Sequence, residues 1–323
     1  MNLPNNRTLQ RLYYSACLLF LFSTSSLAQE SALMLKTANG ELNGSILVPE
    51  GAKSFPLVLI ISGSGPTDRN GNNSGMENNS LKLFAEALQA AGYASLRYDK
   101  RGVGQSDLGV SEEKELTFDN FIYDVKQWVD LLATDKRITK IIIAGHSEGS
   151  LLGMIAAQNN KKVKAFISLA GAGRPADEVI KEQLSVAPDQ IKNIVFPLLD
   201  QVKKGDTIPN IPPVFYAFLR PGIQPYMTSW FKYNPQAEIK KLQIPILIVQ
   251  GLTDVQVKEK DARLLAEAQP KAQLMLVTNM NHVLKECDKT DKESQKPYYE
   301  EPGYPLNKEF MQKTLEFLDP LRK

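Results

Sequence analysis

The sequence predicts an α/β protein with a mostly parallel central sheet, helices on both faces of that sheet, and a helical insertion. Three observations predict this class. From residue 55 onward, apolar β-branched runs alternate with helix-forming segments, which is typical of a parallel sheet. Residues 141–143 are three isoleucines without a polar face, as expected of a strand buried on both sides. The alternation breaks at residues 174–241, where prolines and aromatic side chains gather.

The strands are predicted from short apolar runs bounded by turn residues. They cover residues 33–37, 42–48, 56–61, 94–98, 141–143, 244–251 and 274–277. The first two flank Asn39-Gly40, a dipeptide typical of a hairpin turn. The helices are predicted from apolar residues at helical spacing, with Gly92 ending the first one. They cover residues 81–91, 151–158, 176–184, 191–203 and 310–318, and residues 287–302 are expected to be a surface excursion.

The stretch at residues 174–241 is predicted to form a cap over the site, inserted into a core made of residues 29–173 and 242–323. It contains prolines at positions 197, 209, 212, 213, 221, 225 and 235. Its aromatic and apolar residues lie at 214–219 and at 226, 227, 230, 231 and 233. We expect most of them to form a cap core packed on the sheet edge and a few to line a substrate pocket.

The pentapeptide Gly-His-Ser-Glu-Gly at residues 145–149 joins the isoleucine strand to an apolar helix. A chance match in a glycine-rich loop would lack these flanking elements, so we interpret the motif as a nucleophile elbow. Small residues at Gly145 and Gly149 relieve crowding around a serine held near forbidden backbone angles. The start of the helix directs N–H groups and a positive dipole toward a developing oxyanion. Ser147 is therefore the predicted nucleophile.

A nucleophilic serine needs a base, and the chain has two histidines. His146 lies beside the nucleophile and is expected to point away from the oxyanion, so His282, in the loop after residues 274–277, is the predicted base. Asp254 follows the strand at residues 244–251 and is the predicted acid that orients His282, because such sites have the order Ser, acid, His. Three alternative acids also lie between Ser147 and His282, but none of them follows a strong strand: Asp200, Asp206 and Glu238.

The oxyanion needs two N–H donors. The first is the backbone N–H of Glu148, the residue after the nucleophile. The second is expected from the loop at residues 62–71, where glycines flank Ser64 and leave its amide free to turn toward the substrate. The Gly65 N–H is a competing donor. The loop lacks the Gly-Lys-Ser/Thr ending of a phosphate-binding loop.

Three sequence segments resemble those of a known family: Gly-Ser-Gly-Pro-Thr-Asp-Arg at 63–69, Tyr-Asp-Lys-Arg-Gly-Val-Gly-Gln-Ser at 98–106, and the pentapeptide at 145–149. The chain resembles α/β-hydrolases of the exported bacterial esterase and serine-aminopeptidase-like branch, in particular carboxylesterases of the esterase D type. The resemblance spans nearly the whole mature chain and implies acyl-ester hydrolysis without a cofactor. One departure is Ser62, where many relatives have a histidine that supports the loop.

The string at residues 98–106 contains two charged residues, Asp99 and Arg101, that could be mistaken for catalytic groups. We expect them to form a hydrogen-bonded pair that stiffens a glycine-rich loop beside the site. The resemblance implies the same structural role.

Residues 1–28 have the features of a secretory signal peptide: Arg7 and Arg11, an apolar stretch at 12–22, and small residues at Ser26 and Ala28. Cleavage there would start the mature chain at Gln29 and export it to the periplasm or the medium. The apolar stretch is short for a membrane span, so we expect no stable membrane anchor, although an uncleaved anchor is the alternative.

Charge and cysteine content narrow the function classes. The chain has 38 Lys and Arg against 36 Asp and Glu, and the predicted signal peptide removes two arginines and no acids, so the mature chain is close to neutral. No nucleic-acid partner is indicated. Only Cys287 would remain, which excludes an intramolecular disulfide. Two histidines and one cysteine do not suggest a metal site, and we expect neither a metal nor an organic cofactor.

The predicted function is hydrolysis of small-molecule acyl esters by Ser147, His282 and Asp254 through an acyl-enzyme. Short to medium acyl chains are the first substrate hypothesis, and the oligomeric state is left open. One alternative is an exported aminopeptidase, which would need an acidic group in the cap such as Glu178 or Glu182. The other is a non-catalytic ligand-binding protein of the same fold.

Overall fold

A computed structural model describes residues 30–322 of the chain. The predicted signal peptide at residues 1–28 lies outside the described residues. Within the described part, no helix has both the length and the apolar character that crossing a membrane requires.

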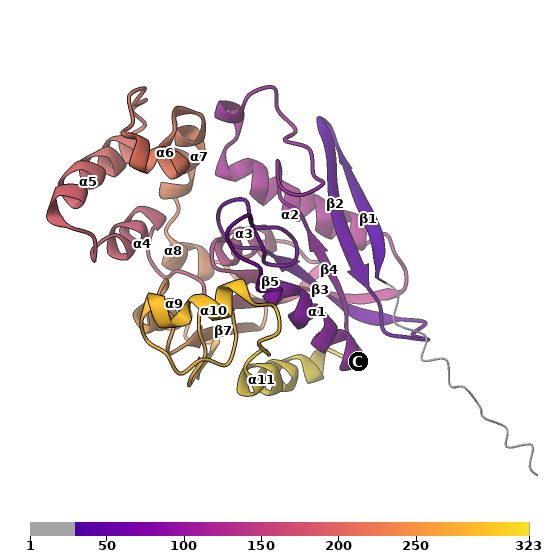
Figure 1. Ribbon diagram of the computed structural model, residues 1–323. Coiled ribbons are helices and arrows are strands. Elements are labelled where there is room, and N and C mark those ends of the chain that lie inside the picture. Colours follow the sequence, from indigo (N-terminus) through magenta and orange to yellow (C-terminus); the bar gives the residue numbers. More distant parts are fainter. Residues whose placement is uncertain (1–29, 323) are drawn as a thin grey trace, which may run out of the picture.

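The described residues form a twisted sheet of eight strands in the order β1-β2-β4-β3-β5-β6-β7-β8 (Figure 1). The strands are β1 (Ser31–Thr37), β2 (Gly40–Leu47), β3 (Phe55–Ile61), β4 (Ala94–Tyr98), β5 (Ile138–His146), β6 (Val163–Leu169), β7 (Ile246–Gly251) and β8 (Gln273–Val277). Strand β2 runs antiparallel to both of its neighbours, and every other pairing is parallel. This confirms the predicted mostly parallel sheet. In the hairpin, Thr37 pairs with Gly40, so the turn lies one residue earlier than predicted.

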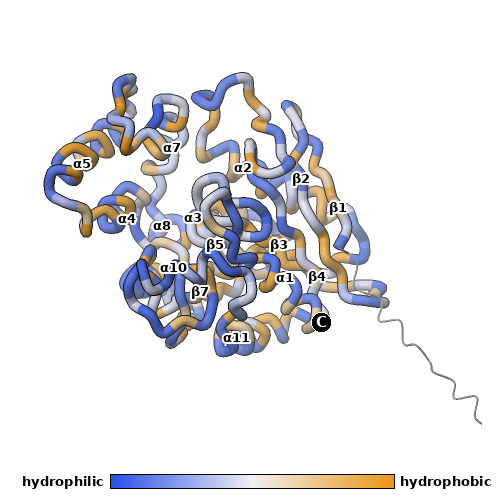
Figure 2. Tube along the Cα trace, in the orientation of Figure 1, coloured by the Kyte–Doolittle hydropathy of each residue, from blue (hydrophilic) through white to orange (hydrophobic). Residues whose placement is uncertain are grey.

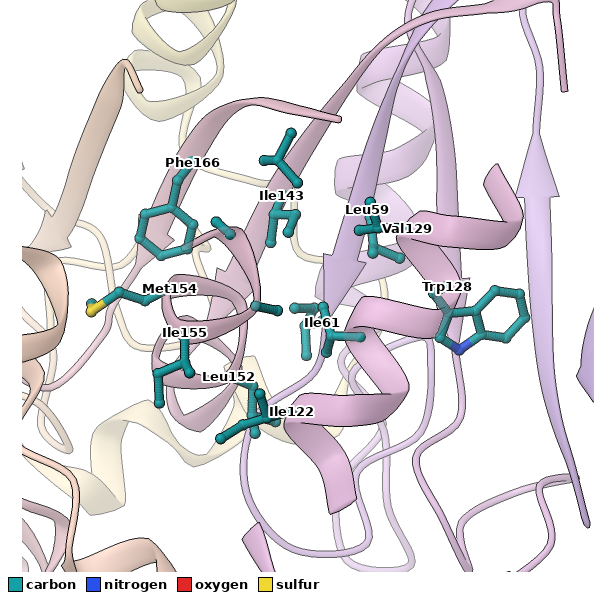
Figure 3. Close-up of a cluster of buried hydrophobic side chains, with 14 of the residues drawn as sticks. Leu59, Ile61, Ile122, Trp128, Val129, Ile143, Leu152, Met154, Ile155 and Phe166 are labelled. Carbon is teal, nitrogen blue, oxygen red and sulfur yellow. The ribbon is translucent and has the colours of Figure 1, made fainter. Parts of the chain in front are cut away.

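Helices cover both faces of the sheet, as predicted. One face packs against α2 (Phe118–Leu132), α3 (Glu148–Ala157) and α9 (Glu259–Ala268), and the other against α1 (Ser80–Ala90) and α11 (Lys308–Leu318). Strand β3 shows why: alternate side chains at 57, 59 and 61 join the first cluster, while those at 58 and 60 join the second. Figure 3 shows the first cluster, where Trp128 of α2 and Leu152 of α3 face Leu59 and Ile61 of β3.

Five helices lie between β6 and β7: α4 (Ala176–Gln183), α5 (Asp189–Lys204), α6 (Tyr216–Leu219), α7 (Gln224–Phe231) and α8 (Pro235–Ile239). Helices α4 to α7 form a lobe beside the sheet with its own apolar cluster, which includes Val195, Leu199, Phe215 and Met227 (Figure 1). Hydrophobic colour along α5 in Figure 2 agrees with this separate cluster. Helix α8 instead packs against α3 and α9, and Ile239 belongs to the main core.

Some of the lobe's large apolar residues form a cap core as expected, including Phe215 and Phe231. Others pack on α2 and not on the predicted sheet edge. The Trp230 ring stacks on Phe118 at a centroid distance of 5.8 Å and an interplanar angle of 8°. The Tyr226 ring meets Phe121 edge-on at 5.2 Å. Helices α2 and α3 lie on the same face of the sheet. The lobe therefore covers the N-terminal end of α3, which follows Ser147.

The segment predicted as a surface excursion contains a helix, α10 (Lys292–Glu300), capped by the Asp291 carboxylate, which accepts from Ser294 N–H at 2.9 Å. Short 3₁₀ turns complete the described elements: η1 (Glu113–Glu115), η2 (Pro213–Phe215), η3 (Pro221–Ile223) and η4 (Asp319–Leu321).

Candidate active site

Ser147 lies at the sharp turn between β5 and α3. Its φ of 53° and ψ of −119° belong to a region that side-chain-bearing residues rarely adopt. Its N–H donates to Leu169 O at 2.8 Å, which ties the turn to β6. Both flanking glycines are required: a Cβ on Gly145 would lie 2.1 Å from Gly149 O, and a Cβ on Gly149 would lie 2.5 Å from Ile61 O. The predicted crowding at the turn is therefore present.

Ser147 borders a cavity of about 770 Å³ between the sheet and the α4–α7 lobe. The cavity wall on the lobe side is largely apolar and includes Val179, Phe218 and Trp230. Two residues that line the cavity, Arg220 of the lobe and Glu113 of η1, form an ion pair through two contacts, with Arg220 Nε at 2.9 Å from Glu113 Oε2. This pair joins the lobe to the core beside the cavity.

His282 and Asp254 are brought together by the loops that follow β8 and β7. His282 Nδ1 lies 2.7 Å from Asp254 Oδ2, and both side chains are buried. Asp254 Oδ1 also accepts from the backbone N–H groups of Gln256 at 2.7 Å and Val257 at 3.0 Å. Burial raises the pKa of Asp254, but the charge and hydrogen bond of His282 and these N–H groups outweigh it, so its pKa is lowered. Asp254 is therefore a carboxylate that orients the imidazole.

The Ser147 hydroxyl makes no hydrogen bond to His282 within residues 30–322. The two residues are linked through His146, whose Nε2 lies 2.7 Å from His282 O and whose ring lies 4.8 Å from the His282 ring. Burial, followed by the charge of His282, lowers the pKa of His146 to about 3. A neutral His146 must donate from Nε2, because its partner is a carbonyl. Sequence reasoning had assigned His146 no role, since a neighbour 136 positions away gives no local signal.

The loop that contains Ser64 lies directly against the elbow. A Cβ on Gly63 would be 3.2 Å from Ser147 Cβ, and Ser64 lines the cavity. Two side chains hold the loop: Thr67 Oγ1 donates to Ser64 O at 2.9 Å, and Ser62 Oγ donates to Thr67 O at 3.1 Å. Among the described residues, no partner accepts from the N–H of Ser64, Gly65 or Glu148, so all three remain available to a ligand.

The charged residues of the string at 98–106 form different ion pairs from those that we expected. Asp99 pairs with Arg69 at 2.7 Å, and Arg101 pairs with Asp124 of α2 at 2.6 Å, so the predicted Asp99–Arg101 pair is wrong. The reason is that Asp99 is turned inward, where it also accepts from Arg69 N at 2.8 Å and Gln105 N at 3.1 Å. Arg101 extends from the next turn toward α2 and meets a different carboxylate.

Lys100, between those two residues, was given no role in the sequence analysis, yet its side chain is buried in the site. Its Nζ donates to Glu148 Oε1 at 2.7 Å and to Gly63 O at 2.6 Å. The two charged side chains are only 3% and 1% exposed. Across residues 30–322, no group of three or more His, Cys, Asp or Glu side chains is placed to hold a metal ion.

Comparison with known proteins adds two sequence matches. Residues 75–212 match the model of the serine aminopeptidase S33 family, a stretch that contains Ser147 but not Asp254 or His282. Esterase EstD of Thermotoga maritima is 28% identical over 257 residues, covering 77% of this chain and 59% of that protein. The chain thus spans about three fifths of the length of this relative.

Two solved structures show the same arrangement of elements. An esterase from Pyrococcus furiosus has a TM-score of 0.59 at 15% identity, covering 90% of this chain and 91% of its own. Est1E from Butyrivibrio proteoclasticus, solved with ferulic acid bound, has a TM-score of 0.61 at 18% identity, covering 89% and 99%. At these identities the likeness establishes the shared fold.

Proposed function

We propose that this chain, which has the α/β-hydrolase fold and resembles the esterases matched above, is a serine esterase that cleaves small carboxylic esters. The observation that carries this proposal is the position of Ser147. It occupies a strained turn at the wall of a cavity, beside unpaired N–H donors, and the adjacent His146 contacts His282 of the buried His282–Asp254 pair. Strain held at such a position is typical of a nucleophile elbow.

The proposed reaction has two steps. His282 Nε2 removes the Ser147 proton as Oγ attacks the ester carbonyl, and the N–H groups of Ser64 and Glu148 bind the oxyanion. His282 then donates that proton to the departing alcohol, which leaves an acyl group on Ser147. Water repeats the sequence and releases the acid. The missing Ser147–His282 hydrogen bond is compatible with this scheme, because such bonds are commonly long in free enzymes and shorten around substrate.

The cavity supports a compact substrate. Its volume of about 770 Å³ lies in the range of pockets that bind small organic molecules, and its apolar lobe-side wall favours an uncharged acyl group of short to medium length. Because Est1E was solved with ferulic acid, hydroxycinnamoyl esters belong in the substrate panel beside straight-chain esters.

Peptide hydrolysis has weaker support. An aminopeptidase needs a free carboxylate to hold the substrate ammonium, yet neither Glu178 nor Glu182 is among the described residues that line the cavity. Glu182 binds Arg174 and Lys260. The carboxylates that do line the cavity, Glu113 and Glu148, are each paired with a cation.

The test uses the mature chain and Ser147→Ala, assayed on p-nitrophenyl esters of increasing chain length and on aminoacyl p-nitroanilides. We expect ester turnover that is lost in the variant, with an optimum at short or medium acyl chains. Preference for the anilides would establish the peptidase instead. No turnover and no fluorophosphonate labelling of Ser147 would support the non-catalytic alternative.

Export is part of the proposal. The features of residues 1–28 support cleavage before Gln29. Expression of the full chain in a bacterium, followed by fractionation and N-terminal sequencing, should give a periplasmic or secreted product that begins at Gln29. A full-length product in the membrane fraction would show that the segment is an uncleaved anchor.

A further inference from the structure

We propose that Lys100 positions the oxyanion hole, with Glu148 holding its ammonium group in place. This inference rests on the proposed esterase function. Lys100 follows β4, yet its Nζ bridges two other parts of the fold: the Gly63 carbonyl in the loop after β3 and the Glu148 carboxylate in the first turn of α3. These parts supply the two proposed oxyanion donors.

The geometry of the peptide unit gives the mechanism. The Gly63 C=O and the Ser64 N–H belong to one planar trans peptide, so they point in opposite directions. A donor that fixes the direction of the C=O therefore also fixes the direction of the N–H. The Lys100 side chain is only 3% exposed, and its Nζ holds the Gly63 carbonyl at 2.6 Å; Ser64 and Lys100 both line the cavity. An ammonium bound to the carbonyl also polarises the peptide and strengthens its N–H as a donor.

The loop itself does not supply this restraint. Its own side chains bind the carbonyls of Ser64 and Thr67, whereas Lys100 is the donor that reaches the Gly63 carbonyl among residues 30–322. A side chain at residue 63 would crowd the nucleophile, because its Cβ would lie 3.2 Å from Ser147 Cβ. The glycine found there leaves the following peptide greater rotational freedom. Among the described residues, the hydrogen bond from Lys100 is therefore the one that holds the Gly63–Ser64 peptide itself.

Glu148 has two separate roles in this arrangement. Its backbone N–H is a proposed oxyanion donor, and its side chain neutralises Lys100 in a site where an unpaired charge would be costly. Lys100 and Glu148 thus act as positioning residues through side chains that need not touch the substrate.

The experiment compares the wild type with Lys100→Met, the double variant Lys100→Met/Glu148→Gln, and Asp124→Asn. The double variant leaves no unpaired buried charge, which protects against simple misfolding. Asp124→Asn is the matched control, because it weakens the neighbouring buried ion pair with Arg101 and leaves the Gly63 carbonyl untouched. Steady-state kinetics on a p-nitrophenyl ester, inhibition by a trifluoromethyl ketone and melting temperature are measured for each.

We expect kcat of the double variant to fall by about 10- to 100-fold, less than the about 10²–10³-fold cost of deleting a donor outright. KM should change by less than about threefold, and trifluoromethyl ketone affinity should fall in proportion to kcat/KM, because the bound hemiketal has an oxyanion. Lys100→Met should show the same kinetic pattern, and Asp124→Asn should keep kcat within about twofold.

The positioning role is overturned if the folded double variant keeps wild-type kcat and inhibitor affinity, or if Asp124→Asn loses as much. Either result would leave the esterase proposal standing, provided that Ser147→Ala is inactive. If the wild type cleaves no ester in the panel, the rate of fluorophosphonate labelling of Ser147 replaces kcat, since phosphonylation of the serine also places an oxygen in the hole. Labelling equally fast with and without Lys100 would then refute the inference.

Discussion

Replacing Ser147 by glycine should abolish activity and stabilise the fold. The φ of 53° and ψ of −119° at this position are strained for any residue with a Cβ. Such strain costs about 1–3 kcal/mol. Glycine relieves it but loses about 0.5–1 kcal/mol through the greater freedom of its unfolded chain. The net effect is a stabilisation of about 1 kcal/mol, within a range of about 0–2.5 kcal/mol.

The comparison that isolates this effect is Ser147→Gly against Ser147→Ala. Both variants lose the hydroxyl, whose removal breaks no helix-capping bond in the described structure. They differ in the Cβ and therefore in backbone strain. For a protein of this size, 1 kcal/mol corresponds to about 2 °C in melting temperature. Differential scanning calorimetry should thus place Ser147→Gly about 2 °C above Ser147→Ala.

An equal or lower melting temperature for Ser147→Gly would refute the reasoning, because it would mean that the turn stores no strain that glycine can release. A matched substitution pair at Ser185, an exposed position with ordinary backbone angles, supplies the control. There the glycine variant should be the less stable of the two, since only the unfolded-state term remains.

Gly149→Ala should destabilise the fold by about 2 kcal/mol or more and remove activity, because its Cβ would lie 2.5 Å from Ile61 O; chemical denaturation and ester assays measure both. Asp254→Asn should lower kcat by about 10³–10⁴-fold with little change in KM, whereas Asp200→Asn should not. The lowered pKa of Asp254 means that its carboxylate stabilises the fold above the pKa of the unfolded chain, and that this stability is lost as the pH falls through its folded-state value. Denaturation midpoints should therefore fall more steeply with acid in the wild type than in Asp254→Asn. The pKa of His146, lowered to about 3 from 6.5, predicts an additional loss of wild-type stability as the pH falls below 6.5, about 2 kcal/mol at pH 5, which His146→Gln lacks; parallel acid-dependence curves for these two proteins would contradict this.

The elements closest to the candidate site could be predicted because each depends on short-range properties of the chain. The isoleucine run at residues 141–143 is apolar on both faces, and β5 lies at the centre of the sheet. The glycines at 145 and 149 are set by the clash that any Cβ would cause there. The loops carrying Asp254 and His282 could be placed because the ends of parallel strands share one edge of the sheet.

Interactions between distant segments could not be predicted in the same way. Asp99 and Arg101 are two positions apart and of opposite charge, yet each has a different partner because the chain turns between them. The contact of His146 with His282 and the contact of the lobe aromatics with α2 depend on how separate elements pack.

By itself, the sequence determined the fold class, the turn at Ser147 and the identity of the residues proposed for catalysis. These follow from hydrophobic periodicity, from glycine's missing Cβ and from the small number of histidines. Only the tertiary structure decided that Lys100 reaches both Gly63 O and Glu148, and that the charged string divides between Arg69 and Asp124. The physical reason is that a buried charge takes whichever partner the packed backbone brings within about 3 Å, and sequence separation sets no limit on that partner.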